Sequence, residues 1–129
     1  MTTECDAENP RKTFLEDQFF TLSLMATSQR ARLYKPDSPE KNRKAFHDAL
    51  QKKLWNLGQE YREAVPEEGH IANIQVFSDY LSREHAGVLR DGRFRIGPAQ
   101  KALNMYLKYL WCAGWIPEPP HCPRDMTAS

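Results

Sequence analysis

The residues best suited to chemistry gather between Val88 and Trp111, where five basic side chains stand against a single acid, Asp91. This local excess of +4 lies in a chain whose formal net charge is only +1. Guanidinium groups bind carboxylates and phosphates through paired hydrogen bonds, which makes arginine well suited to such contacts. The segment therefore predicts a basic contact surface for an acidic protein partner or for nucleic acid, made of Arg90, Arg93, Arg95, Lys101 and Lys108.

The same charges have a plainer interpretation. Charged residues on an outer strand oppose edge-to-edge pairing, and these arginines would then pair with Glu67, Glu68 or the acidic first ten residues. In the binding interpretation, Tyr106 or Tyr109 would lie beside the basic side chains. Both interpretations stay open from the sequence.

Zinc ligands are the second chemical possibility, offered by Cys112, His121 and Cys122 with Cys5 or a distant histidine as the fourth. These residues form no C-x₂-C pair, and the adjacent His121 and Cys122 are poorly placed to coordinate one ion together. We therefore expect no metal site and no cofactor. The simpler expectation is a buried thiol at Cys112 and an exposed thiol at Cys122.

Four histidines are the candidate general bases: His47, His70, His85 and His121. Their candidate partners are Asp79, Glu84 and the cysteines. No G-x-S-x-G, P-loop, H-E-x-x-H or G-x-G-x-x-G motif is present. His85 is explained simply as a residue near a helix C-terminus, where the helix dipole favours its protonated form. The sequence nominates no reaction and no catalytic residue.

Length and composition fit one folded domain. The chain has 129 residues, of which 40% are hydrophobic and 11% aromatic, which is enough for a single core. A near-neutral total charge provides no global attraction to nucleic acid or anionic lipid. Neither a secretory signal nor a membrane-spanning run is visible, and three cysteines make no disulfide framework. We expect a cytoplasmic protein without a membrane partner.

The element that must organise the fold is a helix over residues 98–115. Its apolar residues cover most of the circumference, and its polar residues Lys101, Asn104 and Lys108 form one narrow stripe. Pro98 suits its first turn and Gly114 a left-handed cap at its end. The pattern predicts a central helix enclosed by the rest of the domain.

Three further helices are expected before it. The first spans about residues 11–33, with one apolar side made of Phe14, Leu15, Phe19, Leu22 and Met25 and another made of Phe20 and Leu24, so that it needs cover on more than one face. The second starts at Ser38 as N-cap and Pro39, ends before Pro66 and buries Phe46, Leu50, Leu54, Leu57 and Tyr61. The third follows the PEEGH loop over about residues 71–86, with Gly87 as its C-cap.

Between the third helix and the central helix the hydrophobic period changes. In VLRDGRFRI, short alternating arms flank Asp91 and Gly92, and an Asp-Gly pair favours the type I′ turn of a two-residue hairpin. Arms this short are marginal alone and would lie against the helices. We predict one short β-hairpin at this point.

The C-terminal third contains DGRFRIGPAQKALNMYLKYLW followed by GWIPEPPHCPRD, in which four prolines exclude a helix and a central strand. This run resembles a segment of small uncharacterised bacterial proteins. The resemblance covers roughly the last third of the chain and implies no activity. It suggests only that the helix and the proline-rich strap form a fixed unit.

The predicted fold is mainly α: a small four-helix domain over residues 1–129, with one short β-hairpin before a central C-terminal helix and a proline-rich tail. Residues 1–10 and 117–129 are expected to be extended or flexible. The favoured function is a non-enzymatic adaptor, inhibitor or regulatory module that binds a protein partner through the basic residues, with nucleic-acid binding as the alternative. A small enzyme or ligand-binding bundle using His85 and His121, and a homo-oligomer joined through Trp55, Trp115 and Phe20, are the further alternatives.

Overall fold

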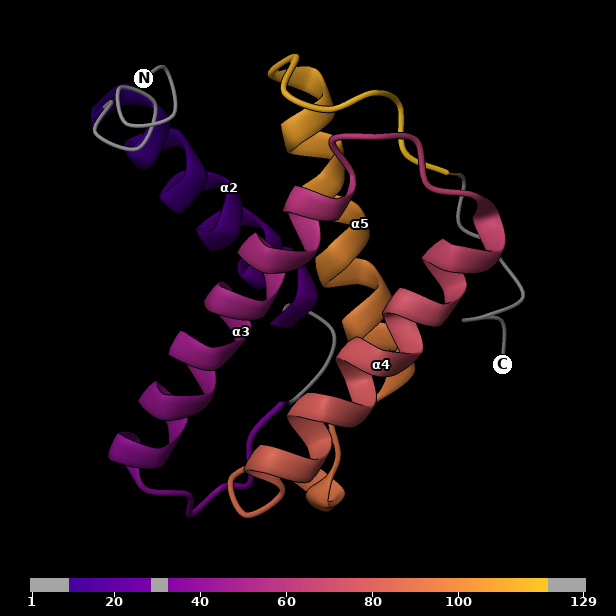
Figure 1. The fold of residues 1–129 in the computed structure, drawn as a ribbon. Helices are drawn as coiled ribbons and strands as arrows, with labels where there is room; N and C mark the ends of the chain where they lie inside the picture. Colours follow the sequence, from indigo (N-terminus) through magenta and orange to yellow (C-terminus); the bar gives the residue numbers. More distant parts are fainter. Residues whose placement is uncertain (1–9, 29–32, 121–129) are drawn as a thin grey trace.

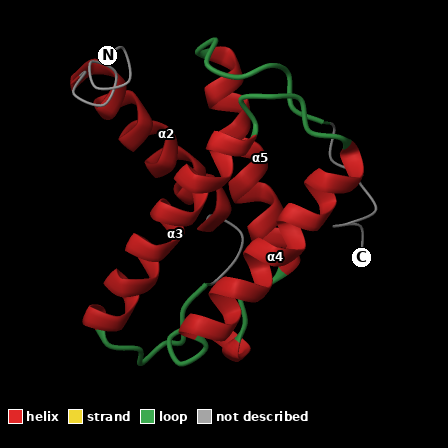
Figure 2. Cartoon of the chain, viewed as in Figure 1, coloured by secondary structure: helices red, strands yellow, loops and turns green. Residues whose placement is uncertain are grey.

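Four helices make up most of the part of the chain that the computed structural model describes, residues 10–28 and 33–120 (Figure 1). They are α2 (Pro10–Ser28), α3 (Glu40–Glu60), α4 (Glu67–His85) and α5 (Ile96–Cys112), with a 3₁₀ turn, η1 (Arg90–Gly92), before α5. Figure 2 shows helices joined by loops and no strand within these residues. The prediction of a mainly α fold is confirmed. None of these helices combines the length and apolar composition needed to cross a bilayer.

The helix α5 is central to the fold, since it contacts all three other helices and packs most extensively on α2 (Figure 1). Its buried side carries Ala99, Ala102, Leu103, Tyr106, Leu107 and Leu110. The enclosure is incomplete, since Lys101 and Lys108 are exposed on the opposite side and Trp111 keeps 41% of its surface. At its end Gly114 has a φ of +80°, as the cap requires.

The helix α2 buries the smaller of its two predicted apolar sides, the one that contains Phe20. Phe20, Ser23 and Thr27 are buried, whereas the side made of Phe14, Leu15, Leu22 and Met25 is exposed. The buried hydroxyls are satisfied locally: Ser23 Oγ donates to the carbonyl of Phe19 at 2.7 Å and Thr27 Oγ1 donates to that of Ser23 at 2.8 Å. Phe19, the fifth member of that side, is partly buried against Tyr109 and Trp115, so the cover expected on a second face is only partial within the described residues.

The buried stripe predicted for α3 is confirmed, but the helix boundaries differ. Pro39 is the N-cap of α3, and the Ser38 hydroxyl instead donates to the carbonyl of Lys35 at 2.8 Å. The PEEGH loop belongs to α4, which starts at Glu67 after Pro66, because acids in a first turn favour helix formation. Gly87 does not adopt a positive φ, so it is no left-handed cap.

A glycine in the last turns of α3, Gly58, has a packing role. Gly58 is buried, and a Cβ atom there would lie 3.0 Å from Leu110 Cδ1 and 3.2 Å from Tyr106 Cε2. Its missing side chain lets α5 approach α3 closely. The ring of Tyr106 lies against this part of the α3 backbone.

The predicted hairpin is wrong in its pairing, although its turn is present. Asp91 and Gly92 have φ angles of 59° and 69°, and the amide of Arg93 donates to the carbonyl of Arg90 at 3.2 Å. The first arm pairs elsewhere, since Leu89 forms an antiparallel bridge with Tyr34 in the α2–α3 connection.

The second arm is held by side chains of α4 in place of a strand. Ser82 Oγ accepts a hydrogen bond from the Phe94 amide at 2.8 Å, and the hydroxyls of Ser78 and Ser82 both donate to the Phe94 carbonyl. Phe94 itself is fully buried. Two arms too short for a stable ladder have therefore found other partners.

The chain after α5 follows the prediction as far as residue 120. Trp115 is partly buried and Ile116 is buried, and the following prolines continue without helix or strand. The expectations for residues 1–9 and 121–129, with Cys5, His121, Cys122 and Pro123 among them, lie outside the described residues.

Candidate functional site

The five basic residues of the predicted contact surface, called the basic surface from here on, are all exposed: Arg90, Arg93, Arg95, Lys101 and Lys108. The guanidinium of Arg93 lies 3.8 Å from Asp79 Oδ1 on α4, so its partner is neither Glu67 nor Glu68. The other four basic side chains form no ion pair with any residue that the structure describes.

Two rigid elements carry these side chains. Arg90 and Arg93 flank the η1 turn, whose backbone is fixed to the α2–α3 connection because the Arg90 amide donates to the Leu33 carbonyl at 2.8 Å. Lys101 and Lys108 are seven positions apart on the open side of α5, which corresponds to about 10 Å along the helix. The structure records no direct contact among the five side chains.

The expected tyrosines do not accompany the basic surface. Tyr106 is 3% exposed and faces α2 and α3. Tyr109 stacks on Phe19 of α2, with ring centroids 5.4 Å apart and planes 13° from parallel. Both rings therefore pack on the side of α5 that faces α2.

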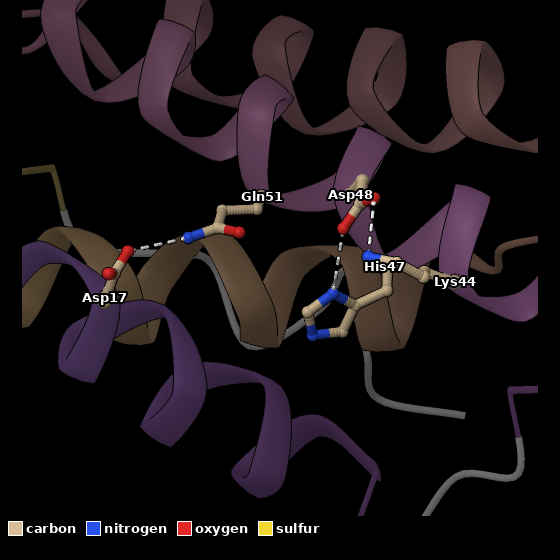
Figure 3. A network of polar contacts seen from close by, with 5 residues as sticks. All are labelled: Asp17, Lys44, His47, Asp48 and Gln51. Carbon is tan, nitrogen blue, oxygen red and sulfur yellow. Dashed lines mark hydrogen bonds and ion pairs between the residues drawn. The ribbon is translucent and has the colours of Figure 1, made fainter.

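The described histidines make no catalytic pair with a cysteine. His47 Nδ1 lies 3.5 Å from Asp48 Oδ1, and the other oxygen of Asp48 receives Lys44 Nζ at 3.3 Å (Figure 3). Both contacts are at the surface. His85 packs edge-on against Phe46 with ring centroids 5.6 Å apart.

His70 is the one described histidine that is fully buried, and it lies in a polar network at the junction of α3, α4 and α5. The Tyr61 hydroxyl lies 2.6 Å from His70 Nδ1, and His70 Nε2 lies 2.9 Å from Asn104 Oδ1. Asn73 Nδ2 donates to the Tyr61 oxygen at 3.0 Å. One hydrogen arrangement satisfies every contact: Tyr61 donates to Nδ1, and a neutral ring protonated on Nε2 donates to Asn104.

The pKa values in this network agree with a neutral ring. Burial lowers the pKa of His70, against smaller opposing effects of the Asn104 hydrogen bond and of Glu67. Burial also raises the pKa of Tyr61. None of the three hollows found among the described residues is lined by a member of this network. The sequence pattern predicts Asn104 in the polar stripe with Lys101 and Lys108, and its spacing gives no sign of this different role.

The predictions for the cysteines and for a metal site can be compared with the structure only within the described residues. Cys112 is a free thiol, and it is exposed where we expected burial. Within the described residues, no group of three or more His, Cys, Asp or Glu side chains is arranged to hold a metal ion.

The aromatic residues predicted to join two copies do not form one exposed set. Phe20 is 3% exposed and belongs to the core, which rules it out as an interface residue in this conformation. Trp115 is partly buried against Phe19, with ring centroids 5.6 Å apart. Trp55 keeps 45% of its surface.

A hollow between α2 and α3, which no sequence pattern predicts, has a volume of about 370 Å³. Hydrogen bonds from α3 to α2 cross it: Gln51 Nε2 donates to Asp17 Oδ1 at 3.0 Å (Figure 3) and Trp55 Nε1 donates to Glu16 Oε2 at 3.2 Å. This α2–α3 hollow is lined by Thr13, Glu16, Asp17, Phe20, Asp48, Gln51, Lys52, Trp55 and Tyr106. Its residues come from three helices, so no local motif could have revealed it.

The chain matches no protein-family model, no curated protein and no solved structure.

Proposed function

We propose that the protein is a non-enzymatic binding module, an adaptor, inhibitor or regulator, that recognises an acidic segment of a protein partner through the basic surface. The observation that carries this proposal is that Arg90, Arg95, Lys101 and Lys108 are exposed and without an ion-pair partner among the described residues. Among the described residues, Arg93 is the one member of the basic surface with an ion-pair partner, Asp79 at 3.8 Å.

Unpaired exposed charges favour intermolecular contacts because no internal ion pair has to be broken first. An arginine that meets a carboxylate from a partner forms two charge-assisted hydrogen bonds in one plane. The backbone around Arg90 and Arg93 is already fixed by hydrogen bonds to Leu33 and Ser82. Binding would therefore have to order side chains but not the loop that carries them, which lowers its entropic cost.

Nucleic acid is the alternative partner, since phosphates also accept paired hydrogen bonds from arginine. We favour protein because the formal net charge of the chain is only +1, so that no global field supports binding to a polyanion. Salt dependence separates the two partners. Neutralising several phosphates makes the affinity fall steeply with salt concentration, whereas an interface with few ion pairs responds less.

The test is affinity capture from a lysate of the native host, with and without nuclease, using Arg90→Ala/Arg93→Ala/Arg95→Ala beside the wild type. The matched control is Lys35→Ala/Lys41→Ala/Lys44→Ala, which removes three exposed lysines elsewhere and brings the formal net charge from +1 to the same −2. A specific protein retained by the control, lost with the arginine variant and resistant to nuclease supports the proposal. Equal loss in both triple variants, or capture that nuclease abolishes, contradicts it.

A captured partner allows a quantitative check with purified proteins. Truncating exposed arginines that contact carboxylates should weaken binding by roughly ten- to a hundredfold, and Lys101→Ala/Lys108→Ala should show whether the surface extends along α5. An unchanged dissociation constant for both variants would remove the basic surface from the interface.

A further inference from the structure

The α2–α3 hollow has the size of a ligand site and lies apart from the basic surface. Its volume of about 370 Å³ falls within the range of roughly 300 to 1,000 Å³ that is common for small-molecule sites. A smaller hollow of about 200 Å³ adjoins it and shares Glu16, Trp55 and Tyr106. The Trp55–Glu16 hydrogen bond thus joins two residues that line both hollows.

Tyr106 lines both hollows, and its hydroxyl is a candidate ligand contact. The residue is 3% exposed, yet its hydroxyl makes no hydrogen bond with any described residue. Burial raises the pKa of Tyr106, and the negative charges of Glu16 and Asp17 raise it further, so the group stays neutral beside these carboxylates. The hydroxyl oxygen itself is not fully buried, so it is open to solvent and can exchange a water molecule for a hydrogen bond from a ligand.

The charge of the hollow indicates which ligand it would accept. Three carboxylates, Glu16, Asp17 and Asp48, and a single lysine, Lys52, line this hollow, and Lys44 offsets Asp48 from outside the lining, which leaves an excess of one negative charge. Asp48 is already occupied by Lys44 and His47, as Figure 3 shows.

Glu16 and Asp17 differ from Asp48 because their hydrogen-bond partners are neutral. The indole N–H of Trp55 and the side-chain amide of Gln51 donate to them, and no described cation forms an ion pair with either carboxylate. Each carboxylate has lone pairs beyond the one bond that it accepts. Both therefore remain able to accept hydrogen bonds from a cation that enters the hollow.

Aromatic surfaces complete the site. Phe20, Trp55 and Tyr106 line the same space, and the faces of aromatic rings attract cations while their carbon atoms cover an apolar chain. An ammonium group on an alkyl chain has three donors, no acceptor and an apolar body. Its donors would match the Tyr106 oxygen and the carboxylates of Glu16 and Asp17.

We propose that the α2–α3 hollow is a binding site for a primary alkylammonium group, which donates hydrogen bonds to Glu16, Asp17 and the Tyr106 hydroxyl and lays its alkyl chain along Trp55. The same group is available from two sources, a free alkylamine or the side chain of a lysine in a partner protein.

The first experiment titrates the full-length ¹⁵N-labelled protein with n-butylammonium chloride and follows the indole N–H of Trp55 and the side-chain amide of Gln51 by NMR. The comparison compounds are 1-butanol, which has the same chain without the charge, and sodium butyrate, which has the opposite charge. Saturable shifts at both groups with butylammonium alone support the proposal. Shifts that do not saturate, or that 1-butanol or butyrate reproduces, overturn it.

Two isosteric variants test the assigned residues. Tyr106→Phe removes only the hydroxyl and Asp17→Asn removes only the charge, and each should raise the dissociation constant of butylammonium about tenfold. Asp79→Asn, an equal loss of charge on the outer side of α4, should leave the constant unchanged. Because Asp17 is exposed, Asp17→Asn keeps the test decisive if Tyr106→Phe proves unstable in a thermal melt. Unchanged affinity in the folded variants overturns the site.

A final comparison separates the two sources. The peptide acetyl-Gly-Lys-Gly-amide presents the same ammonium group on a protein backbone. Binding as tight as that of butylammonium, with the same loss in Asp17→Asn, assigns the site to a lysine side chain. Binding of butylammonium without the peptide assigns it to a free amine. Either result supports an ammonium site, and the absence of both contradicts it without bearing on the basic surface.

Discussion

The Nε2 atom of His70 on α4 lies 2.9 Å from Oδ1 of Asn104 on α5, in a part of the molecule where His70 is fully buried. With the Tyr61 hydroxyl on its other nitrogen, the imidazole joins three helices through hydrogen bonds that a neutral ring satisfies. Buried polar networks of this kind stabilise a structure only while every member keeps its partner. The network thus connects the stability of the fold to its protonation state.

Acidification should destabilise the protein through His70. Burial lowers the pKa of His70 in the folded state below its ordinary value of about 6.5, so the unfolded chain takes up a proton that the folded chain resists. The contribution is fully present above about pH 6.5 and is lost as the pH falls from there through the folded-state pKa, at no more than about 1.4 kcal/mol per pH unit. Urea unfolding between about pH 7.5 and 5 measures this decrease.

His70→Gln provides the control, because glutamine does not titrate in this range. We expect that variant to be less stable at neutral pH and to show a weaker dependence on pH. If the variant and the wild type lose stability equally on acidification, the pH dependence has another origin. An NMR titration of the His70 ring with an ordinary pKa would also contradict the assignment.

Enlarging Gly58 should separate α3 from α5. The nearest atoms to an added Cβ are Leu110 Cδ1 at 3.0 Å and Tyr106 Cε2 at 3.2 Å, so Gly58→Val should lower the free energy of unfolding by about 2 kcal/mol through overpacking. Ala45→Val, at an exposed position of the same helix, measures the cost of a β-branched residue alone, which is about 0.5 kcal/mol. Equal effects of the two changes in chemical denaturation would refute the close approach.

Gly92 in the η1 turn and Gly97 in the first turn of α5 should respond oppositely to alanine. Gly92 has a φ of +69°, and a Cβ atom in the left-handed region costs about 1–2 kcal/mol. Gly97 has no positive φ and no atom within 4 Å of its added Cβ, so Gly97→Ala should leave stability unchanged or raise it by up to about 1 kcal/mol. Thermal melts of both variants give the comparison, which fails if Gly92→Ala is the more stable.

The orientation of α2 is tested by two phenylalanines. Phe14 is 61% exposed and Phe20 only 3%, so Phe14→Ser should change stability by less than about 0.5 kcal/mol, whereas Phe20→Ser should cost about 3–5 kcal/mol. Denaturant unfolding of each variant measures both values. A larger loss at Phe14 would mean that the helix buries the opposite face in solution.

Helix content was predictable because strong periodicity specifies both an element and its buried side. The set from Phe46 to Tyr61 repeats every three or four residues, and all five members are buried as expected. In α2 apolar residues occur on two sides, so hydrophobicity alone could not choose between them. Packing against α5 decided the matter through Phe20 and the self-satisfied hydroxyls of Ser23 and Thr27.

Long-range polar contacts were beyond the sequence because local patterns do not encode them. Asp91 and Gly92 specified the turn correctly, yet the partners of its arms, Tyr34 and Ser82, come from other segments. The α2–α3 hollow likewise exists only once three helices meet. Charged side chains are expected at the surface, so the exposure of the basic surface was predictable. The ion pair between Arg93 and Asp79 of α4 was not predictable from the sequence.

The α2–α3 connection pairs with the segment before η1 through two backbone amides, and hydrogen exchange at these amides should report on the cooperative unfolding of the whole domain. The Lys35 amide donates to the Val88 carbonyl at 3.0 Å and the Arg90 amide to the Leu33 carbonyl at 2.8 Å, outside any helix. Local fraying of one helix cannot release them, because each is fixed between segments far apart in the chain. Hydrogen–deuterium exchange at these positions should therefore be as slow as in the core helices and follow global unfolding, although they belong to loops.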